Sequence, residues 1–210
     1  MPAQPLVVAT RNQGKTVEFG RLLGPYFATE LLPRNVTLPP EEGITFRTNA
    51  VAKAGAAYEA MGRKAWVLAD DSGLEVKALD GRPGVMSARY AGVDATDGEN
   101  LRLLLEEMDG CQERSAHFVC SLALMRSAVS GEEDAVGRDA AIIVVEGYLE
   151  GVLETEPRGD GGFGYDPVFR PAGWSKTLAE ASASEKDAVS HRGAAVRALR
   201  AKLGAEEEDR

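Results

Sequence analysis

The first segment with residues suited to phosphate chemistry is Thr10-Arg11-Asn12-Gln13-Gly14-Lys15, which lies between a short apolar run and a stretch with helical spacing. A loop that leads from a strand into a helix presents free backbone N–H groups and the positive end of the helix dipole, and both favour phosphate. The alternative is an ordinary strand-to-helix turn with a surface lysine. The P-loop pattern GxxxxGK[ST] is excluded, because Ala9 stands where its first glycine is required.

The second segment group is acidic. Glu41 and Glu42 precede Gly43, and Asp70, Asp71 and Glu75 lie around a further glycine turn at Gly73. Magnesium prefers a few carboxylates together with water and substrate phosphate, so a small set brought together in space would hold it. Neighbouring residues of an extended segment point to opposite sides, so we expect only one of Asp70 and Asp71 to face a given site. The alternative is that all of them are solvated turn carboxylates.

A third segment, Gly161–Pro167, is dense in glycine and contains two aromatic rings and a carboxylate. Glycine lets a backbone approach a ligand closely, and Phe163 or Tyr165 would offer a flat face to a base. This pattern favours a ligand-binding loop over a plain surface loop.

The fourth segment combines Glu185-Lys186 with Ser190-His191-Arg192-Gly193 at the entrance of a predicted helix. Lysine and arginine there would hold phosphate oxygens or a purine carbonyl. Helix capping with surface charge is the alternative. The other histidine, His117, lies in a predicted strand and is expected to be structural.

Composition and missing motifs exclude several other classes of protein. The formal net charge of −9 makes long polyanions such as duplex DNA poor partners. Cys111 and Cys120 lack CxxC spacing and are expected to be reduced thiols in a cytosolic protein. No zinc-ligand spacing, GxSxG nucleophile motif or GxGxxG fingerprint occurs, and no secretory signal or membrane-spanning apolar run is found.

The elements that must position these residues alternate between strand and helix along the chain. Strands are predicted at Leu6–Ala9, Trp66–Ala69, Phe118–Met125 and Ala140–Val145, the last two joined by a hairpin loop over 127–139. Helices are predicted from Val17 to Leu23, after Thr45 up to Gly62, over 101–108 and over 194–203. This alternation indicates an α/β protein built on a mixed sheet. We expect one domain over residues 1–204, and an acidic solvated tail over residues 205–210.

These segments, taken together and in order, resemble the inosine triphosphate pyrophosphatase-like family, which acts on non-standard purine nucleoside triphosphates. The match runs from about Leu6 to Leu203, and its blocks are Thr10–Lys15 with Glu18, Gly43–Phe46 with Asn49-Ala50 and Lys53-Ala54, Ala69–Leu74 with Ser87–Tyr90, Gly161–Phe169, Ala179-Glu180, and Glu185-Lys186 with Ser190–Gly193. Several separated blocks in one order are far more specific than a single motif.

The resemblance implies an elongated mixed α/β fold of two lobes with a central active-site cleft, a homodimer, and magnesium as the cofactor. It implies that Thr10, Arg11, Asn12, Gln13, Gly14 and Lys15 bind the triphosphate. It implies that Glu41 and Asp71 bind the metal, that Asp71 also accepts the proton of the attacking water, and that Ser72 touches the substrate. Base recognition and substrate binding fall to Phe163, Gly164, Tyr165, Asp166, Lys186, His191 and Arg192.

The implied reaction is attack of water at the α-phosphorus of inosine, deoxyinosine or xanthosine triphosphate, with pyrophosphate leaving. Two residues depart from the family pattern. Arg11 stands where a small residue is usual, and Thr48 stands where an acidic residue is common. The first would add a phosphate contact or narrow the loop, and the second leaves a carboxylate missing near Glu41.

Two alternatives to this function remain at the level of sequence. One is a related pyrophosphatase for modified pyrimidine or methylated nucleotides, against which the Gly161–Asp166 and Ser190–Arg192 blocks argue. The other is a nucleotide-binding sensor that has kept the pocket and lost catalysis.

Overall fold

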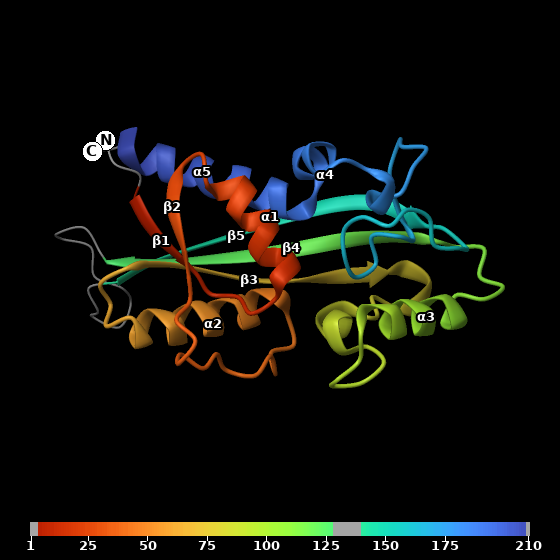
Figure 1. Ribbon diagram of the computed structural model, residues 1–210, viewed down its shortest axis with the longest axis horizontal. Helices are drawn as coiled ribbons and strands as arrows, with labels where there is room; N and C mark the ends of the chain where they lie inside the picture. Colours follow the sequence, from red (N-terminus) through yellow and green to blue (C-terminus); the bar gives the residue numbers. More distant parts are fainter. Residues whose placement is uncertain (1–3, 128–139, 209–210) are drawn as a thin grey trace. The chain divides into compact units, whose positions relative to one another are not determined.

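The computed structural model describes residues 4–127 and 140–208 and contains one six-stranded sheet flanked by helices (Figure 1). The order of its strands is β2-β1-β3-β4-β5-β6. Strand β1 pairs in parallel with β2 and β3, whereas β5 and β6 are antiparallel, so the sheet is mixed. The predicted α/β class is confirmed.

The strands are β1 (Gln4–Val8), β2 (Phe27–Leu31), β3 (Trp66–Val76), β4 (Ser115–Ser127), β5 (Ala140–Leu153) and β6 (Phe169–Pro171). The α-helices are α1 (Gln13–Leu23), α2 (Phe46–Ala60), α3 (Asp97–Glu107), α4 (Ala183–Val189) and α5 (His191–Glu208). Three 3-10 helices cover Lys77–Leu79, Gly84–Arg89 and Leu178–Glu180. In the described part of the chain, no helix combines the length and apolar character that a bilayer crossing requires.

The described chain divides into two compact units, each built from separated segments. The first unit comprises residues up to Asp71, Ser121–Glu146 and the segment from Ala195 onward. In it, helix α2 lies on the opposite side of the strands from α1 and α5 (Figure 1). Ala50, Ala54, Ala57 and Tyr58 of α2 pack with residues of β1, β3 and β4 in one buried cluster. The small alanine side chains let this helix lie close to the sheet, which matters for the site below.

The second unit comprises Ser72–Cys120 and Gly147–Ala194. Its core joins Leu104 of α3 and Met108, which directly follows α3, to Leu74, Phe118 and Phe169 of three strands. The rings of Phe118 and Phe169 lie 4.6 Å apart between centroids. Strands β3, β4 and β5 each contribute residues to both units. The prediction of a single domain over 1–204 stays a prediction.

The structure corrects several predicted boundaries. The expected stop at Ala69 is wrong, because β3 continues through Asp70-Asp71-Ser72-Gly73 to Val76. Strand β2, strand β6 and helix α4 were not predicted, since each is short and has weak periodicity. Helix α5 reaches Glu208, so residues 205–208 are helical instead of a tail. Most of the predicted hairpin loop, residues 128–139, lies outside the described residues.

Candidate active site

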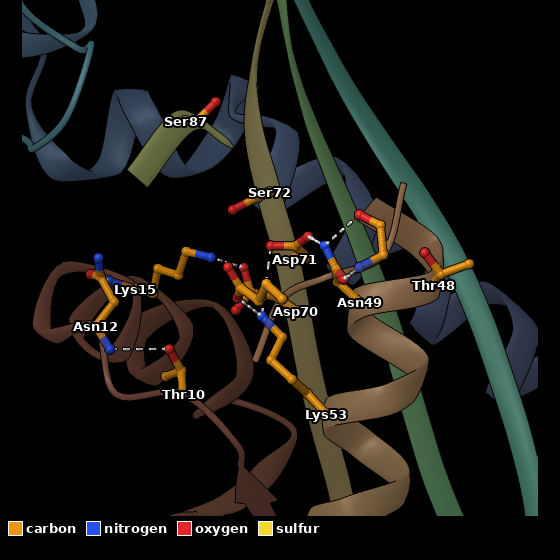
Figure 2. A network of polar contacts seen from close by, with 12 residues as sticks. Thr10, Asn12, Lys15, Thr48, Asn49, Lys53, Asp70, Asp71, Ser72 and Ser87 are labelled. Atoms are coloured by element: carbon orange, nitrogen blue, oxygen red, sulfur yellow. Dashed lines mark hydrogen bonds and ion pairs between the residues drawn. The ribbon is translucent and has the colours of Figure 1, made fainter. Parts of the chain in front are cut away.

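Asp70 and Asp71 lie side by side in strand β3, and both are buried, with 3% of their surface exposed. Consecutive side chains of a strand point to opposite faces, and the two carboxylates accordingly have different partners. Asp70 Oδ2 lies 2.7 Å from Lys15 Nζ, whereas Asp71 Oδ2 accepts a 2.8 Å hydrogen bond from Asn49 Nδ2 (Figure 2). The two carboxylates thus have different partners, but both act on Lys53, so the prediction that only one of them faces a given site is not confirmed. The alternative of solvated turn carboxylates is wrong, because both residues are buried in a strand.

Helix α2 supplies two polar side chains to Asp71. Asn49 and Lys53 are four residues apart, so they lie on the same face of the helix. Both are buried although they interrupt a stripe of alanines. The start of the helix is fixed by a capping box, in which Thr45 Oγ1 accepts from the Thr48 N–H at 3.1 Å and the Thr48 hydroxyl accepts from the Thr45 N–H.

Lys53 and Asn49 were not among the predicted site residues. The signal that would have found them is the presence of an amide and an ammonium on the apolar face of a helix. Such groups are rarely buried without a partner.

The ammonium of Lys53 joins two carboxylates. Its Nζ lies 2.5 Å from Glu41 Oε1 and 3.6 Å from Asp71 Oδ1. Glu41 lies in the irregular segment between β2 and α2, which is also held by Asn49, whose Oδ1 accepts a 2.7 Å hydrogen bond from the Gly43 N–H. A Cβ at Gly43 would overlap Thr48 and Asn49, so this approach requires glycine. Asn49 therefore connects the Glu41 segment to Asp71.

We call Lys15, Glu41, Asn49, Lys53, Asp70 and Asp71 the acid–lysine cluster. Burial raises the pKa of Asp71 above the ordinary range of an aspartate, and the charges of Lys53 and Lys15 oppose this effect. Burial lowers the pKa of Lys53, but Asp70, Asp71 and Glu41 outweigh it, so its pKa lies above that of an ordinary lysine. Lys53 is therefore held as a cation by the acids around it.

The arrangement of Glu41 and Asp71 fits a hard cation. Both carboxylates reach one positively charged group, so their oxygens already converge on a point where a cation is stable. Within residues 4–127 and 140–208, no group of three or more His, Cys, Asp and Glu side chains gathers as a metal site. Two carboxylates completed by water and phosphate are the usual protein contribution to a magnesium site, whereas zinc and calcium sites use more protein ligands.

The predicted phosphate loop lies at the start of helix α1. Asn12 is the N-cap residue, and its Oδ1 accepts a 3.0 Å hydrogen bond from the Lys15 N–H. Thr10 Oγ1 accepts from the Asn12 N–H at 3.3 Å. Gln13 and Gly14 are the first two residues of the helix, so their N–H groups belong to its unsatisfied first turn. The loop geometry that the sequence predicted is therefore present.

A second group of predicted residues meets around the Gly161–Pro167 loop, and we call Ser72, Phe163, Asp166, Lys186 and Arg192 the glycine-loop cluster. Lys186 Nζ forms a 2.5 Å ion pair with Asp166 Oδ2, and both side chains are almost fully buried. The half-buried Phe163 ring has Lys186 Nζ 4.8 Å and the Arg192 guanidinium 5.0 Å from its centroid. Arg192 also donates to Ser72 Oγ at 2.8 Å.

The loop owes its shape to two carboxylates. Asp166 accepts from the Phe163 N–H at 2.9 Å, and Asp97 of α3 accepts from the Gly164 N–H at 2.7 Å. Gly162 has a φ of +73°, and a Cβ there would overlap Asp166, so only glycine suits this turn. The ring of Phe163 is thereby fixed at the rim of the loop.

Tyr165 and His191 are buried deeper than the sequence suggested. Tyr165 is 4% exposed and donates to the Ser87 backbone oxygen at 2.8 Å, and burial raises the pKa of its phenol. Of the two aromatic rings offered by the sequence, Phe163 is therefore the more accessible to a base. His191 is 1% exposed and stacks on Phe118, with ring centroids 4.7 Å apart. His117 pairs with Glu75 at 2.9 Å, in keeping with a structural role.

Comparison with known proteins identifies the family of this chain. The model of the Ham1 family matches residues 6–202, which is nearly the whole chain. The chain belongs to the Ham1 family. The resemblance inferred from the ordered sequence blocks is thereby confirmed.

Individual relatives are similar over most of their length. A dITP/XTP pyrophosphatase of Syntrophobacter fumaroxidans is 46% identical over 195 residues, which cover 91% of this chain and 78% of the relative. One from Mycobacterium tuberculosis is 46% identical over 202 residues, or 92% of both proteins. The solved structure of the Staphylococcus aureus Ham1 protein is 36% identical and has a TM-score of 0.80, with 97% of this chain and 100% of that chain covered.

The buried Asp166–Lys186 pair gives a prediction about stability. Lys186→Met leaves Asp166 buried without its ammonium, so we expect the free energy of unfolding to fall by about 3 kcal/mol or more, measured by urea denaturation. The matched control is Lys176→Met, which breaks the exposed pair with Glu185 and should change stability little. Adding Asp166→Asn to Lys186→Met should recover part of the loss. Equal effects of the two lysine variants would show that the buried pair is unimportant.

Proposed function

We propose that this Ham1-family protein hydrolyses non-standard purine nucleoside triphosphates, such as inosine, deoxyinosine and xanthosine triphosphate, to the monophosphate and pyrophosphate. The observation that carries the proposal is the buried Asp71 carboxylate, which contacts Asn49 and Lys53. Glu41 forms an ion pair with the same Lys53 ammonium. The names of its relatives, dITP/XTP pyrophosphatases at 46% identity, support the same activity.

The acid–lysine cluster suits attack of water on a phosphorus atom. Asp71 has the raised pKa expected of a group that accepts a proton from water in a buried site. Lys15 and Lys53 provide positive charge that offsets the charge on the phosphate oxygens. The N-terminus of α1, capped by Asn12, offers further N–H donors to the triphosphate.

Magnesium is the proposed cofactor, with Glu41 and Asp71 as its protein ligands. When bound, the ion would neutralise phosphate charge and polarise the phosphorus. Two carboxylates, which the chain already brings to one cation, suit an ion that keeps several water ligands.

The glycine-loop cluster suits a purine with a 6-keto group. Phe163 offers an aromatic face on which a base can stack. Lys186 and Arg192 beside it are hydrogen-bond donors without acceptor capacity, so they match a carbonyl oxygen, whereas the 6-amino group of adenine offers them no acceptor. The placement of Gly164, Tyr165, Asp166 and Ser72 in or beside this cluster supports their predicted role in substrate binding. A direct role of the buried His191 and a homodimeric assembly both stay predictions.

The experiment that tests the proposal is pyrophosphate release from inosine, guanosine and adenosine triphosphates, each with magnesium and with a chelator. We expect magnesium-dependent turnover that is much faster for inosine triphosphate than for adenosine triphosphate, because hydrogen-bond donors tell a keto from an amino group at the 6-position. Guanine also has a 6-keto group, so slower turnover of guanosine triphosphate would have to come from its 2-amino group. Equal rates for all three would indicate a general nucleotide pyrophosphatase. Tight binding of inosine triphosphate without turnover would favour a nucleotide-binding sensor that has lost catalysis.

The role of Asp71 is tested by Asp71→Asn, which keeps the shape of the side chain and removes the base. We expect kcat to fall by about a hundredfold or more, while binding of inosine triphosphate in the presence of a chelator is kept. Glu106→Gln, which changes an exposed carboxylate on α3, serves as the control and should leave kcat unchanged. Undiminished turnover of the Asp71 variant would refute the assignment of the base.

A further inference from the structure

Arg11, one of the two residues that depart from the family pattern, makes three hydrogen bonds to backbone oxygens. Its Nη1 donates to the Leu32 oxygen at 2.8 Å, and its Nη2 donates to the oxygens of Pro33 and Val36, each at 2.7 Å. Three of the five N–H groups of the guanidinium are therefore used within the protein. The side chain extends from the phosphate loop to the segment that follows β2.

Two of the three oxygens, those of Pro33 and Val36, belong to a turn at the start of the Glu41 segment, and the Leu32 oxygen directly precedes this turn. The Val36 N–H donates to the Pro33 oxygen at 3.0 Å, which closes the turn and leaves its carbonyls converging on Arg11. Residues 32–45 contain no helix or strand. At the far end of the segment, the Gly43 N–H donates to Asn49 Oδ1 at 2.7 Å. Arg11 thus holds the near end and Asn49 the far end of the segment that carries Glu41.

Only arginine suits this set of contacts. A guanidinium is planar and presents its N–H groups in a fixed fork, so it can serve three carbonyls at once in one geometry. A lysine carries the same charge, but all of its N–H groups are on one nitrogen atom, so they do not form the planar fork of a guanidinium. Replacement by lysine would therefore keep the charge of the loop but lose the three-way contact.

We propose that Arg11 is a positioning residue that fixes the phosphate loop relative to the Glu41 segment, and that it does not bind phosphate itself. This inference rests on the proposed function, because the two connected segments are those assigned to triphosphate and metal. Fixing both segments before the ligands arrive lowers the ordering cost of binding. Arg11 consequently affects the binding of metal and triphosphate, while the proton transfer at Asp71 and the choice of base do not depend on it.

The test compares Arg11→Lys and Arg11→Ala with Arg34→Lys and Arg34→Ala. Arg34 is an exposed arginine in the same segment and provides a control matched in charge and location. In both Arg11 variants we expect two quantities to rise by roughly three- to tenfold, which are KM for inosine triphosphate and the magnesium concentration at half-maximal rate. This is the size of effect expected when hydrogen bonds that hold a loop are lost. We expect kcat and the preference over guanosine triphosphate to change less than about twofold.

Amide hydrogen exchange gives a second readout that does not depend on activity. Both Arg11 variants should exchange faster over residues 32–43 and remain unchanged over α3, whereas the Arg34 variants should match the wild type. An Arg11→Lys variant with wild-type KM would overturn the proposal in favour of a direct phosphate contact. Unchanged exchange in both Arg11 variants would also overturn it. A wild-type protein without pyrophosphatase activity would refute the proposed function, and the exchange data would still decide whether Arg11 holds the segment.

Discussion

The rest of the first unit depends on one constraint, which is that the buried carboxylate of Asp71 needs partners. Burial disfavours its charge and raises its pKa, so the chain must supply donors around it. Helix α2 does this with Asn49 and Lys53, and its alanines allow it to lie close enough to the sheet. The Glu41 segment is in turn held by the same two side chains. A strand, a helix and an irregular segment are thus arranged around a single charge.

The second unit follows the same principle with Asp166, which is buried, paired with Lys186, and bonded to the backbone of its own loop. Buried ion pairs contribute little net stability compared with apolar packing, because removing two charges from water costs nearly as much as their attraction returns. The buried pairs Lys15–Asp70, Lys53–Asp71 and Lys186–Asp166 are therefore better explained by ligand binding than by stability. Each cluster contains ammonium groups, which are hydrogen-bond donors that suit phosphate or carbonyl oxygens.

Much of the fold and the site followed from local patterns, and the failures have physical causes. The helix after Thr45 was predicted because its cap and its alanine spacing are local signals, and the structure contains both. The strand was predicted to end at Ala69, because the residue types of Asp70 and Asp71 favour turns. Contacts with distant residues, among them Lys15 and Lys53, stabilise the two carboxylates in a buried strand. Lys53 was not predicted for the same reason, because its partners Glu41 and Asp71 lie in other segments of the chain. The Thr48 departure has a local explanation, since its hydroxyl fills the place of the acidic residue in a capping box.

In the proposed reaction, water activated at Asp71 attacks the α-phosphorus of the nucleotide. Hydrolysis of inosine triphosphate in ¹⁸O-labelled water, followed by mass spectrometry of both products, tests it most directly. Attack at the α-phosphorus places the label in inosine monophosphate and leaves pyrophosphate unlabelled. Label in pyrophosphate, or release of labelled orthophosphate with inosine diphosphate, would place the attack at another phosphorus and contradict the role assigned to the acid–lysine cluster.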